Sequence, residues 1–360
     1  MRMILGILFC LNIWGLRVGA QTVFRLVEPV QDMQSTRKLG QVNLYRPQWS
    51  PDGRFLSVEM IGASTRKLYV LEEAKNIVYK PLFSHTGPAD PPPSGLGLGI
   101  PILPKGSANL GLNWSHSEAR NGVCVYVGSG EKGVYNLYKD RVSSPNNTFR
   151  RQLTGNTGGT QHAMFPNYHP TEAVVAFSQG TKEYLGLKLM QVGGNSRLHG
   201  LLSGKAFTVS HPRFSPVSTS QVTHLAFVGG AEGANDIYLI KLEGLSSNSL
   251  GTTGLREAPP LLLVNWESVE SHPRWSSDGR QIAFLSTRGH GNQKGVAALY
   301  VVNMDGTGLK KLVDKVVKTD NDTFVWSADS DYIFFSKYAY EEKNPICYVH
   351  VGGGQPQELH

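Results

Sequence analysis

The chain has 360 residues, of which 40% are hydrophobic and only 18% are charged. A chain of this length buries roughly 75% of its unfolded surface when it folds, so the composition favours a globular protein with a sizeable core. The 40 glycines and 20 prolines are fewer than low-complexity disordered chains contain, and they do not follow the collagen period. They predict many tight turns and exclude a coiled coil.

The first 20 residues have the pattern of a cleaved signal peptide. Arg2 gives a basic start, residues 4–16 are almost all apolar, and Val18-Gly19-Ala20 offers small residues for cleavage before Gln21. The apolar stretch is shorter than the ~20 residues that a membrane span needs. We therefore expect a signal peptide over residues 1–20, a secreted or periplasmic location, and no membrane span in the mature chain. The alternatives are an uncleaved anchor and an ordinary first helix.

The net charge of +7 arises from 35 Lys and Arg residues against 28 Asp and Glu residues. The basic residues are scattered, without a run of Lys or Arg and without interleaved aromatic residues, so nucleic acid is not an expected partner. After residue 20 the cysteines are Cys124 and Cys347, each inside an apolar run. We expect two buried thiols rather than a disulfide framework.

An internal repeat organises the rest of the chain. Its clearest copies are Arg46-Pro47-Gln48-Trp49-Ser50-Pro51-Asp52-Gly53 and His272-Pro273-Arg274-Trp275-Ser276-Ser277-Asp278-Gly279, each followed by an apolar segment. Weaker copies share the aromatic residue, which we call the anchor. The anchors are spaced 46 to 65 residues apart, and they are Trp49, Trp114, Tyr168, Phe214, Trp275 and Trp326. A period near 40 to 45 residues is typical of one four-stranded propeller blade, and loops account for the excess.

Each copy predicts a strand, a tight turn and a second strand. The anchor ends the first strand and is large enough to fill the space between two sheets. Pro, Asp and Gly then suit a turn, because Pro fixes φ, Asp bonds to nearby backbone and Gly accepts positive φ. The returning segments, such as residues 174–177 and 282–285, are continuously hydrophobic. This pattern predicts strands buried on both faces, as between stacked blades.

The repeat resembles that of TolB-type β-propellers, with Pro-x-Trp-Ser-x-Asp-Gly followed by Ile-Ala-Phe and later by Leu-Tyr-Val and Asn-x-Asp-Gly. The resemblance runs from about residue 45 to the C-terminus and implies an all-β fold, a six-bladed propeller of four-stranded antiparallel blades. It is limited to the propeller, because only about 25 residues separate Gln21 from the first repeat. We expect one propeller domain over residues 21–360. We also expect residues 22–27 to supply the outer strand of the sixth blade.

The chain lacks the sequence motifs of common catalytic centres. Gly-x-Ser-x-Gly, His-Glu-x-x-His, Cys-x-x-Cys and a phosphate-binding loop are all absent from the sequence. A metal or cofactor is therefore not expected, and the function expected first is a non-enzymatic module that binds a protein or a small anionic ligand, as a monomer.

One set of residues nevertheless suggests a binding site. His211 and His272 occupy the same repeat position, each followed by Pro and Arg. One interpretation is that these histidines pack at the entry of the innermost strand. The other is that they lie at a mouth of the central channel, where they would present hydrogen-bond donors to an anion. The residues of this hypothesis are Arg46, His211, Arg213, His272 and Arg274. The alternative function is a lyase or hydrolase that acts on an anionic saccharide there.

Two further features are specific to this chain. Residues 81–108 are rich in Pro and Gly and too long for a blade turn, so they predict an inserted loop that is either functional or disordered. Asn113, Asn146 and Asn321 begin glycosylation triplets, which matter only in a eukaryote. The first of them adjoins a predicted buried anchor, which argues against its use.

Overall fold

The structure is a computed structural model. It describes main-chain strands at 15–18, 21–24, 43–49, 55–61, 65–72, 77–78 and 83–86, and most residues from 112 to 358. The gaps in this second part are 117, 119–121, 130–133, 142–150, 156–160, 182–183, 194–196, 203–206, 231–234, 292, 294, 319–323 and 339–345. Among the described residues the regular secondary structure is β-strand throughout, as the repeat predicts.

Six sheets follow one another along the chain, each with its strands antiparallel and in sequence order. Sheet 1 consists of β3 (Asn43–Trp49), β4 (Phe55–Ile61), β5 (Thr65–Glu72) and β6 (Ile77–Val78), with β7 (Phe83–Thr86) also pairing β5. Sheet 2 consists of β8 (Leu112–Trp114), β9 (Val123–Ser129), β10 (Tyr135–Arg141) and β11 (Arg151–Gln152). Sheet 3 consists of β12 (His162–Tyr168), β13 (Val174–Gly180), β14 (Leu185–Gln191) and β15 (Leu198–Leu202).

The second half of the chain repeats this order. Sheet 4 consists of β16 (Thr208–Phe214), β17 (Val222–Gly230), β18 (Asp236–Glu243) and β19 (Arg256–Glu257), with β20 (Leu261–Val264) also pairing β18. Sheet 5 consists of β21 (Glu270–Trp275), β22 (Gln281–Ser286), β23 (Val296–Asn303) and β24 (Lys310–Val317). Sheet 6 consists of β25 (Phe324–Trp326), β26 (Tyr332–Ser336), β27 (Ile346–His350) and β28 (Gln357–Glu358).

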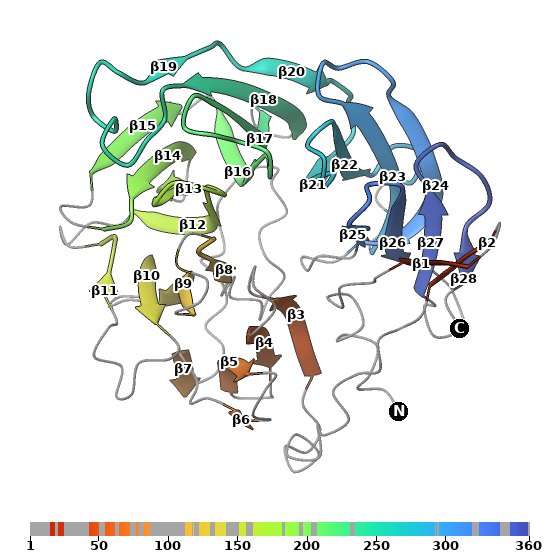
Figure 1. The fold of residues 1–360 in the computed structure, drawn as a ribbon, viewed down its shortest axis with the longest axis horizontal. Helices are drawn as coiled ribbons and strands as arrows, with labels where there is room; N and C mark the ends of the chain where they lie inside the picture. Colours follow the sequence, from red (N-terminus) through yellow and green to blue (C-terminus); the bar gives the residue numbers. More distant parts are fainter. Residues whose placement is uncertain are drawn as a thin grey trace.

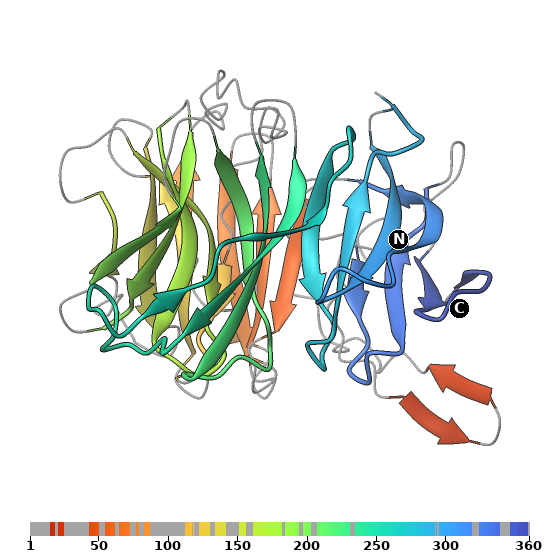
Figure 2. The ribbon, with the colours of Figure 1, turned by 90° about the horizontal axis from the view of Figure 1, so that it is seen from above.

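The sheets stand around a common middle, with their strands running across the thickness of the molecule (Figures 1 and 2). The first strand of each sheet lies toward the middle and the last toward the outside (Figure 1). Four-stranded antiparallel sheets arranged in this way fit a β-propeller. The first strands are therefore the elements that can face a central site.

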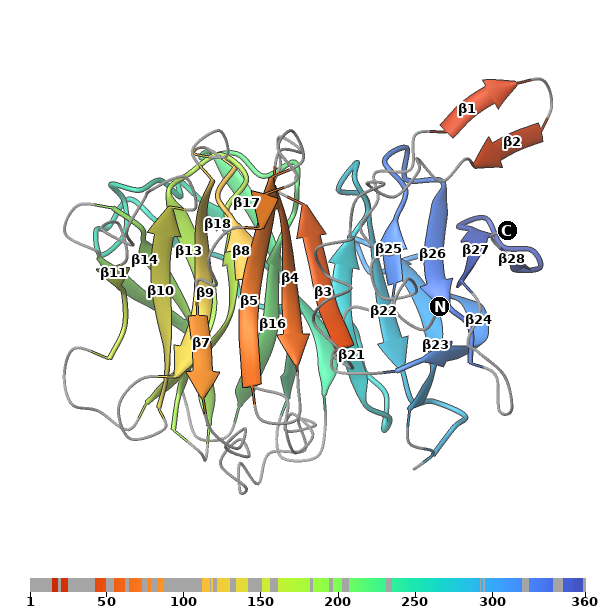
Figure 3. The ribbon, with the colours of Figure 1, turned by 90° about the horizontal axis from the view of Figure 1, so that it is seen from below.

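The prediction that residues 22–27 supply the outer strand of sheet 6 is wrong. That place is taken by β28, whose Gln357 and Glu358 pair with Tyr348 and Cys347 of β27. The N-terminal segment pairs instead with residues just before it, as the hairpin of β1 (Gly15–Val18) and β2 (Gln21–Phe24), which lies apart from the six sheets (Figure 3). The Gly-rich stretch before β28 turns the chain back, so the tail completes its own sheet. The rest of the predicted signal peptide lies outside the described residues.

The hydrophobic core lies between consecutive sheets. On β13, Val175 and Phe177 pack in the cluster shared with sheet 2, whereas Val174 and Ala176 pack in the cluster shared with sheet 4. All four side chains are fully buried. A strand buried on both faces needs an apolar residue at every position, which explains why the second segment of each repeat does not alternate.

The anchors end the first strands, and those with described side chains lie at the contacts between sheets. Trp114, Tyr168, Phe214 and Trp275 are each at most 9% exposed, and Trp326 is partly buried against the cluster between sheets 5 and 6. Trp49 ends β3, and its side chain is outside the described residues. Burying an aromatic side chain stabilises the fold by about 1.5–3 kcal/mol.

The anchors are also hydrogen bonded across each interface. Trp275 Nε1 donates to the carbonyl oxygen of Arg213 at 2.8 Å, and Trp326 Nε1 donates to that of Arg274 at 3.0 Å. In sheets 3 and 4, whose anchors lack an indole, the anchor backbone N–H donates instead to an Asn side chain of the preceding sheet. These bonds are Tyr168 N to Asn113 Oδ1 and Phe214 N to Asn167 Oδ1, both 2.7 Å. Asn113 of the first glycosylation triplet is thus engaged within the fold.

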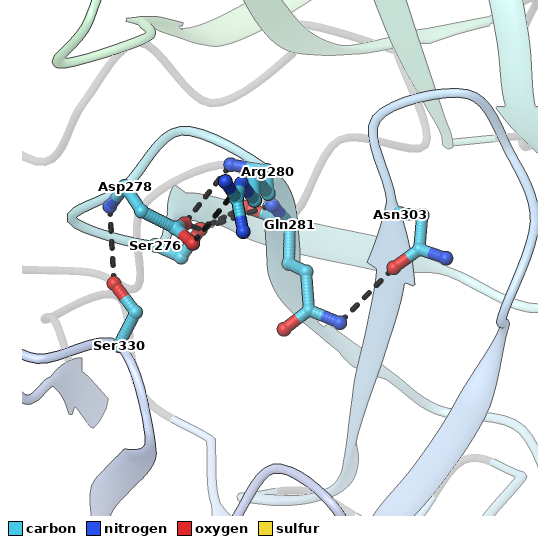
Figure 4. Close-up of polar contacts among 6 residues, drawn as sticks. All are labelled: Ser276, Asp278, Arg280, Gln281, Asn303 and Ser330. Carbon is cyan, nitrogen blue, oxygen red and sulfur yellow. Dashed lines mark hydrogen bonds and ion pairs between the residues drawn. The ribbon is translucent and has the colours of Figure 1, made fainter.

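The turn after the anchor is held by a serine and an aspartate. In sheet 5, Ser276 Oγ donates to Asp278 Oδ1 at 2.6 Å and accepts from Gln281 N at 2.9 Å. Asp278 Oδ1 also accepts from Arg280 N, and Asp278 N donates to Ser330 Oγ in sheet 6 at 3.0 Å. Figure 4 shows these contacts converging on the turn. The Ser-x-Asp-Gly motif is therefore a closed hydrogen-bonded turn that also links neighbouring sheets.

In sheet 3 a histidine replaces the turn serine. His169 Nδ1 accepts from the backbone N–H groups of Thr171 and Glu172, at 3.2 and 3.0 Å. Its Nε2 lies 2.8 Å from Thr223 Oγ1 of sheet 4. Because Nδ1 is an acceptor, Nε2 carries the hydrogen and donates to the threonine. Burial, with His116 adding to it, lowers the pKa of His169 to about 4, so this histidine is neutral and structural.

We expect Trp275→Phe to lower the free energy of unfolding by about 1–3 kcal/mol, because it leaves the buried carbonyl of Arg213 without its donor. Phe214 occupies the same position in sheet 4, so the smaller ring itself is compatible with the interface. Chemical unfolding followed by circular dichroism measures the change. Trp266→Phe, which alters an indole outside the anchor positions, is the control and should have the smaller effect. Equal losses in the two variants would contradict the importance of the indole bond.

Candidate functional site

Four of the first strands share an irregularity at an X-Pro dipeptide. The strand register shifts between the residue before X and the residue after Pro, which is the signature of a β-bulge. The dipeptides are Arg46-Pro47 in β3, Phe165-Pro166 in β12, His211-Pro212 in β16 and His272-Pro273 in β21. A bulge turns one side chain out of the regular alternation, so these positions share an orientation that the flanking residues do not have.

The backbone at these bulges is strained. Phe165, His211 and His272 have φ values of 56°, 50° and 57°. These values lie in the left-handed region, which residues other than glycine rarely adopt. Each such residue costs about 1–3 kcal/mol, and residues of this kind cluster at functional sites. The same strained conformation in three consecutive sheets therefore marks this level of the first strands as a candidate site.

The three bulge side chains contact one another across the sheet boundaries. The ring centroids of Phe165 and His211 are 4.2 Å apart with an interplanar angle of 35°. Those of His211 and His272 are 5.1 Å apart at 42°. His211 Nδ1 also lies 3.0 Å from Ser210 Oγ. We call this row of rings, formed by Phe165, His211 and His272, the bulge stack.

The arginines follow the bulges by two residues. Arg213 and Arg274 are half-buried, and their backbone carbonyls hold the indoles of the next sheet. The backbone next to each bulge is thus held at both arginines. Arg46 lies at the bulge of β3, the position that the two histidines occupy in their sheets; its side chain is outside the described residues.

The structure thus brings part of the predicted site together. His211 and His272 are in contact, and Arg213 and Arg274 occupy equivalent places one sheet apart. Phe165 was not predicted, although it precedes Pro in the third repeat just as each histidine does in its own. Aligning the repeats on Pro, rather than searching for histidine, would have found it.

Glu270 was also missed. It begins β21, two residues before His272, and its side chain is fully buried. Burial raises its pKa to about 7, against hydrogen bonds from Ser268 and Ser286 that lower it. Such a shift in a buried carboxyl group next to a strained site is a common mark of function.

Two other features are absent from the described part of the chain. There, no helix is long and apolar enough to cross a membrane, and no group of three or more His, Cys, Asp and Glu side chains is placed to hold a metal ion. Cys124 and Cys347 are both buried, and the two are not joined by a disulfide.

No protein-family model and no curated protein sequence matches the chain. Solved structures with a similar fold do exist. An oligogalacturonate lyase from Vibrio parahaemolyticus has a TM-score of 0.55 at 13% identity, over 97% of this chain and 85% of the lyase. A TolB from Agrobacterium tumefaciens has a TM-score of 0.51 at 15% identity, over 81% of this chain and 88% of the TolB.

The third neighbour is a larger protein. Prolyl oligopeptidase B from Galerina marginata has a TM-score of 0.56 at 10% identity, over 95% of this chain. The chain spans only 48% of the length of that peptidase. At these identities the likenesses establish a shared fold, that of propeller proteins with different activities, and they do not select one activity.

We expect His272→Val to be less stable than His272→Asn by about 1–3 kcal/mol. Both variants remove the imidazole, but asparagine tolerates positive φ whereas a β-branched residue resists it. The melting temperatures of the two variants give the comparison. A valine variant as stable as the asparagine variant would show that the bulge is not held in the left-handed conformation.

Proposed function

We propose that the chain is a secreted or periplasmic six-bladed β-propeller that binds an anionic ligand, or an acidic segment of a partner protein, without catalysing a reaction. The observation that carries the proposal is the bulge stack with its arginines. Two consecutive sheets present the same His-Pro-Arg sequence at the same strained bulge, and the two imidazoles touch. Imidazole and guanidinium groups gathered on the first strands are donors suited to carboxylate, sulfate or phosphate oxygens.

The blade number rests on the repeat. Sheets 1 to 6 each contain one anchor and at least four antiparallel strands, and six such units are a common number for a closed propeller. Closure would set sheet 1 beside sheet 6 and bring Arg46 into the same ring as His272. The secreted or periplasmic location rests on the pattern of residues 1–20.

Binding is favoured over catalysis by the environment of the histidines. His272 is 7% exposed, and His211 lies between it and the ring of Phe165. A general base must reach the proton that it removes, which a histidine packed in a row of rings does poorly. The arginines are half-buried, less so than His272, and would contribute most of the affinity.

We expect Arg213→Ala combined with Arg274→Ala to weaken binding of a short polyglutamate peptide or an oligogalacturonate by at least about tenfold, because charge-assisted hydrogen bonds are each worth about 1.5–3 kcal/mol. Isothermal titration calorimetry at low salt measures the affinity. Arg280→Ala is the matched control, since that side chain is 85% exposed on a turn and should not matter. Binding that is unchanged in the double variant, or equally weakened in the control, would contradict the proposed site.

The second candidate is a lyase acting on an anionic saccharide. It is favoured by the combination of imidazoles and arginines, because elimination from a uronate needs a base and a cation at the carboxylate, and by the fold shared with an oligogalacturonate lyase. We expect no product when oligogalacturonate is incubated with the protein and the ultraviolet absorbance of the conjugated double bond is followed. Absorbance that rises with wild type and not with His211→Asn would establish the lyase instead.

Residues 81–108 are proposed as a second contact surface, for a protein partner. Phe83–Thr86 forms β7 against β5, so the insertion begins as an edge strand of sheet 1. The residues from 87 to 108 lie outside the described part of the chain.

A further inference from the structure

Glu270 breaks the pattern of its own repeat. Counting back five residues from the anchor places it in register with Val209 of β16 and Ala163 of β12, and both of these are fully buried apolar residues. In sheets 3 and 4 the first strand therefore has a buried hydrocarbon side chain here, whereas sheet 5 has an acid. Burying an ionised carboxylate is expensive unless it is paired or protonated, so the exception calls for a specific compensation.

The two oxygens of Glu270 have different surroundings. Oε1 accepts hydrogen bonds from Ser268 Oγ at 2.6 Å and from Ser286 Oγ at 2.8 Å. Oε2 is fully buried and accepts no hydrogen bond from a donor group of the described residues. Because both hydroxyl groups converge on Oε1, Oε2 is the atom that remains to carry a proton.

A second carboxyl group lies across the boundary with sheet 4. Glu270 N donates to Asn235 O at 2.8 Å, and Asn235 forms a parallel bridge with Val269. Asp236, the next residue, begins β18 and is only 6% exposed. Its Oδ1 accepts from Trp266 N at 3.2 Å. Burial raises the pKa of Asp236, while hydrogen bonds from Trp266 and from Glu270 lower it.

Two ionised carboxylates cannot hydrogen bond to each other, so a bond between these side chains needs one proton. We propose that Asp236 and Glu270 share a single proton, donated from Glu270 Oε2, and that this proton fastens sheet 4 to sheet 5 beside the bulge stack. When the proton leaves for solvent, two negative charges face each other in a buried space and the boundary loosens. This inference goes beyond the proposed binding function and does not depend on it.

The charged groups around the pair determine where it titrates. Burial and the charge of Asp236 favour the protonated form of Glu270, whereas the two serine hydroxyls and Lys318, which follows β24, favour the ionised form. On β18, burial raises the pKa of Tyr238 and the charge of Asp236 adds to the shift, so Tyr238 is a second titratable group near the pair.

Two further titratable groups belong to the elements around the pair. The guanidinium of Arg288 lies 4.5 Å above the ring of Trp266, whose backbone N–H binds Asp236. His272 follows Glu270 on β21.

The sign of the pH effect follows from the direction of the shift. The pKa of Glu270 is raised in the folded chain from 4.5 to about 7, so the folded state binds the proton more tightly than the unfolded state. The stability that the proton contributes is full below 4.5 and is lost as the pH rises through about 7.

The test is the pH dependence of thermal unfolding between about pH 5 and pH 9, without any ligand. We expect the melting temperature of wild type to fall as the pH rises through neutrality. Glu270→Gln, whose amide is neutral and keeps donors for Asp236, should remove this fall and melt higher than wild type at alkaline pH. Glu267→Gln, which changes an exposed carboxylate of the same loop, is the control and should behave as wild type.

A Gln variant with the same pH dependence as wild type would overturn the proposal. If Glu270→Gln does not fold, Asp236→Asn provides a second test: it removes the charge that opposes ionisation of Glu270, and the fall should move to lower pH. Infrared difference spectra between acid and alkaline pH should also show one protonated carboxyl band in wild type that Glu270→Gln lacks. Because none of these readouts uses a ligand, their failure is distinguishable from a failure of the proposed anion binding.

Discussion

From sheet 3 to sheet 6, each sheet is linked to its predecessor by the same kind of contact: the anchor residue of the later sheet bonds to the residue just before the anchor of the earlier one. Two different chemistries serve this purpose. Where the earlier residue is Asn113 or Asn167, its side-chain amide accepts the anchor backbone N–H. Where it is an arginine, its backbone carbonyl accepts an indole N–H instead. The arrangement explains why the anchor varies among Trp, Tyr and Phe while its place in the strand does not.

The same bonds determine where strain can be tolerated. Arg213 and Arg274 follow the bulges directly after Pro, so the indole bonds hold each strand immediately beyond its left-handed residue. A histidine with positive φ would return to an ordinary backbone conformation if its strand could shift register against the next strand. The indole bond beside it holds that register and prevents the shift. The anchor bond, the bulge and the contact between His211 and His272 are therefore one mechanical unit. Packing between the sheets stabilises the fold. This stability offsets the cost of the left-handed backbone conformation at the bulges of the first strands.

Most of this architecture could be predicted from the sequence, because a strand or turn that is unclear in one copy of the repeat is clear in another. The continuous hydrophobic runs at residues 174–177 and 282–285 indicated strands buried on both faces, and the structure confirms them. The outer strand of sheet 6 was assigned wrongly, because a two-residue strand such as Gln357–Glu358 carries no hydropathy signal. Phe165 was missed for another reason. Its place in the bulge stack depends on its backbone conformation, and the residue type alone does not indicate that conformation. Only the alignment of X-Pro dipeptides carries that information.

Glu270 illustrates a general advantage of repeat proteins for this kind of inference. In a chain without repeats, a buried acid can be judged only against average proteins. Here the two preceding sheets give an internal reference, since Val209 and Ala163 show that a small apolar group is sufficient at this register position. The acid comes with its own support: two serine hydroxyls on one oxygen and a second carboxyl group across the boundary. Random substitution of a core residue would not bring three compensating partners with it. The departure from the repeat, the two hydroxyl groups on Oε1 and the buried Oε2 therefore argue together that this boundary, two residues from the bulge stack, is built to hold a proton.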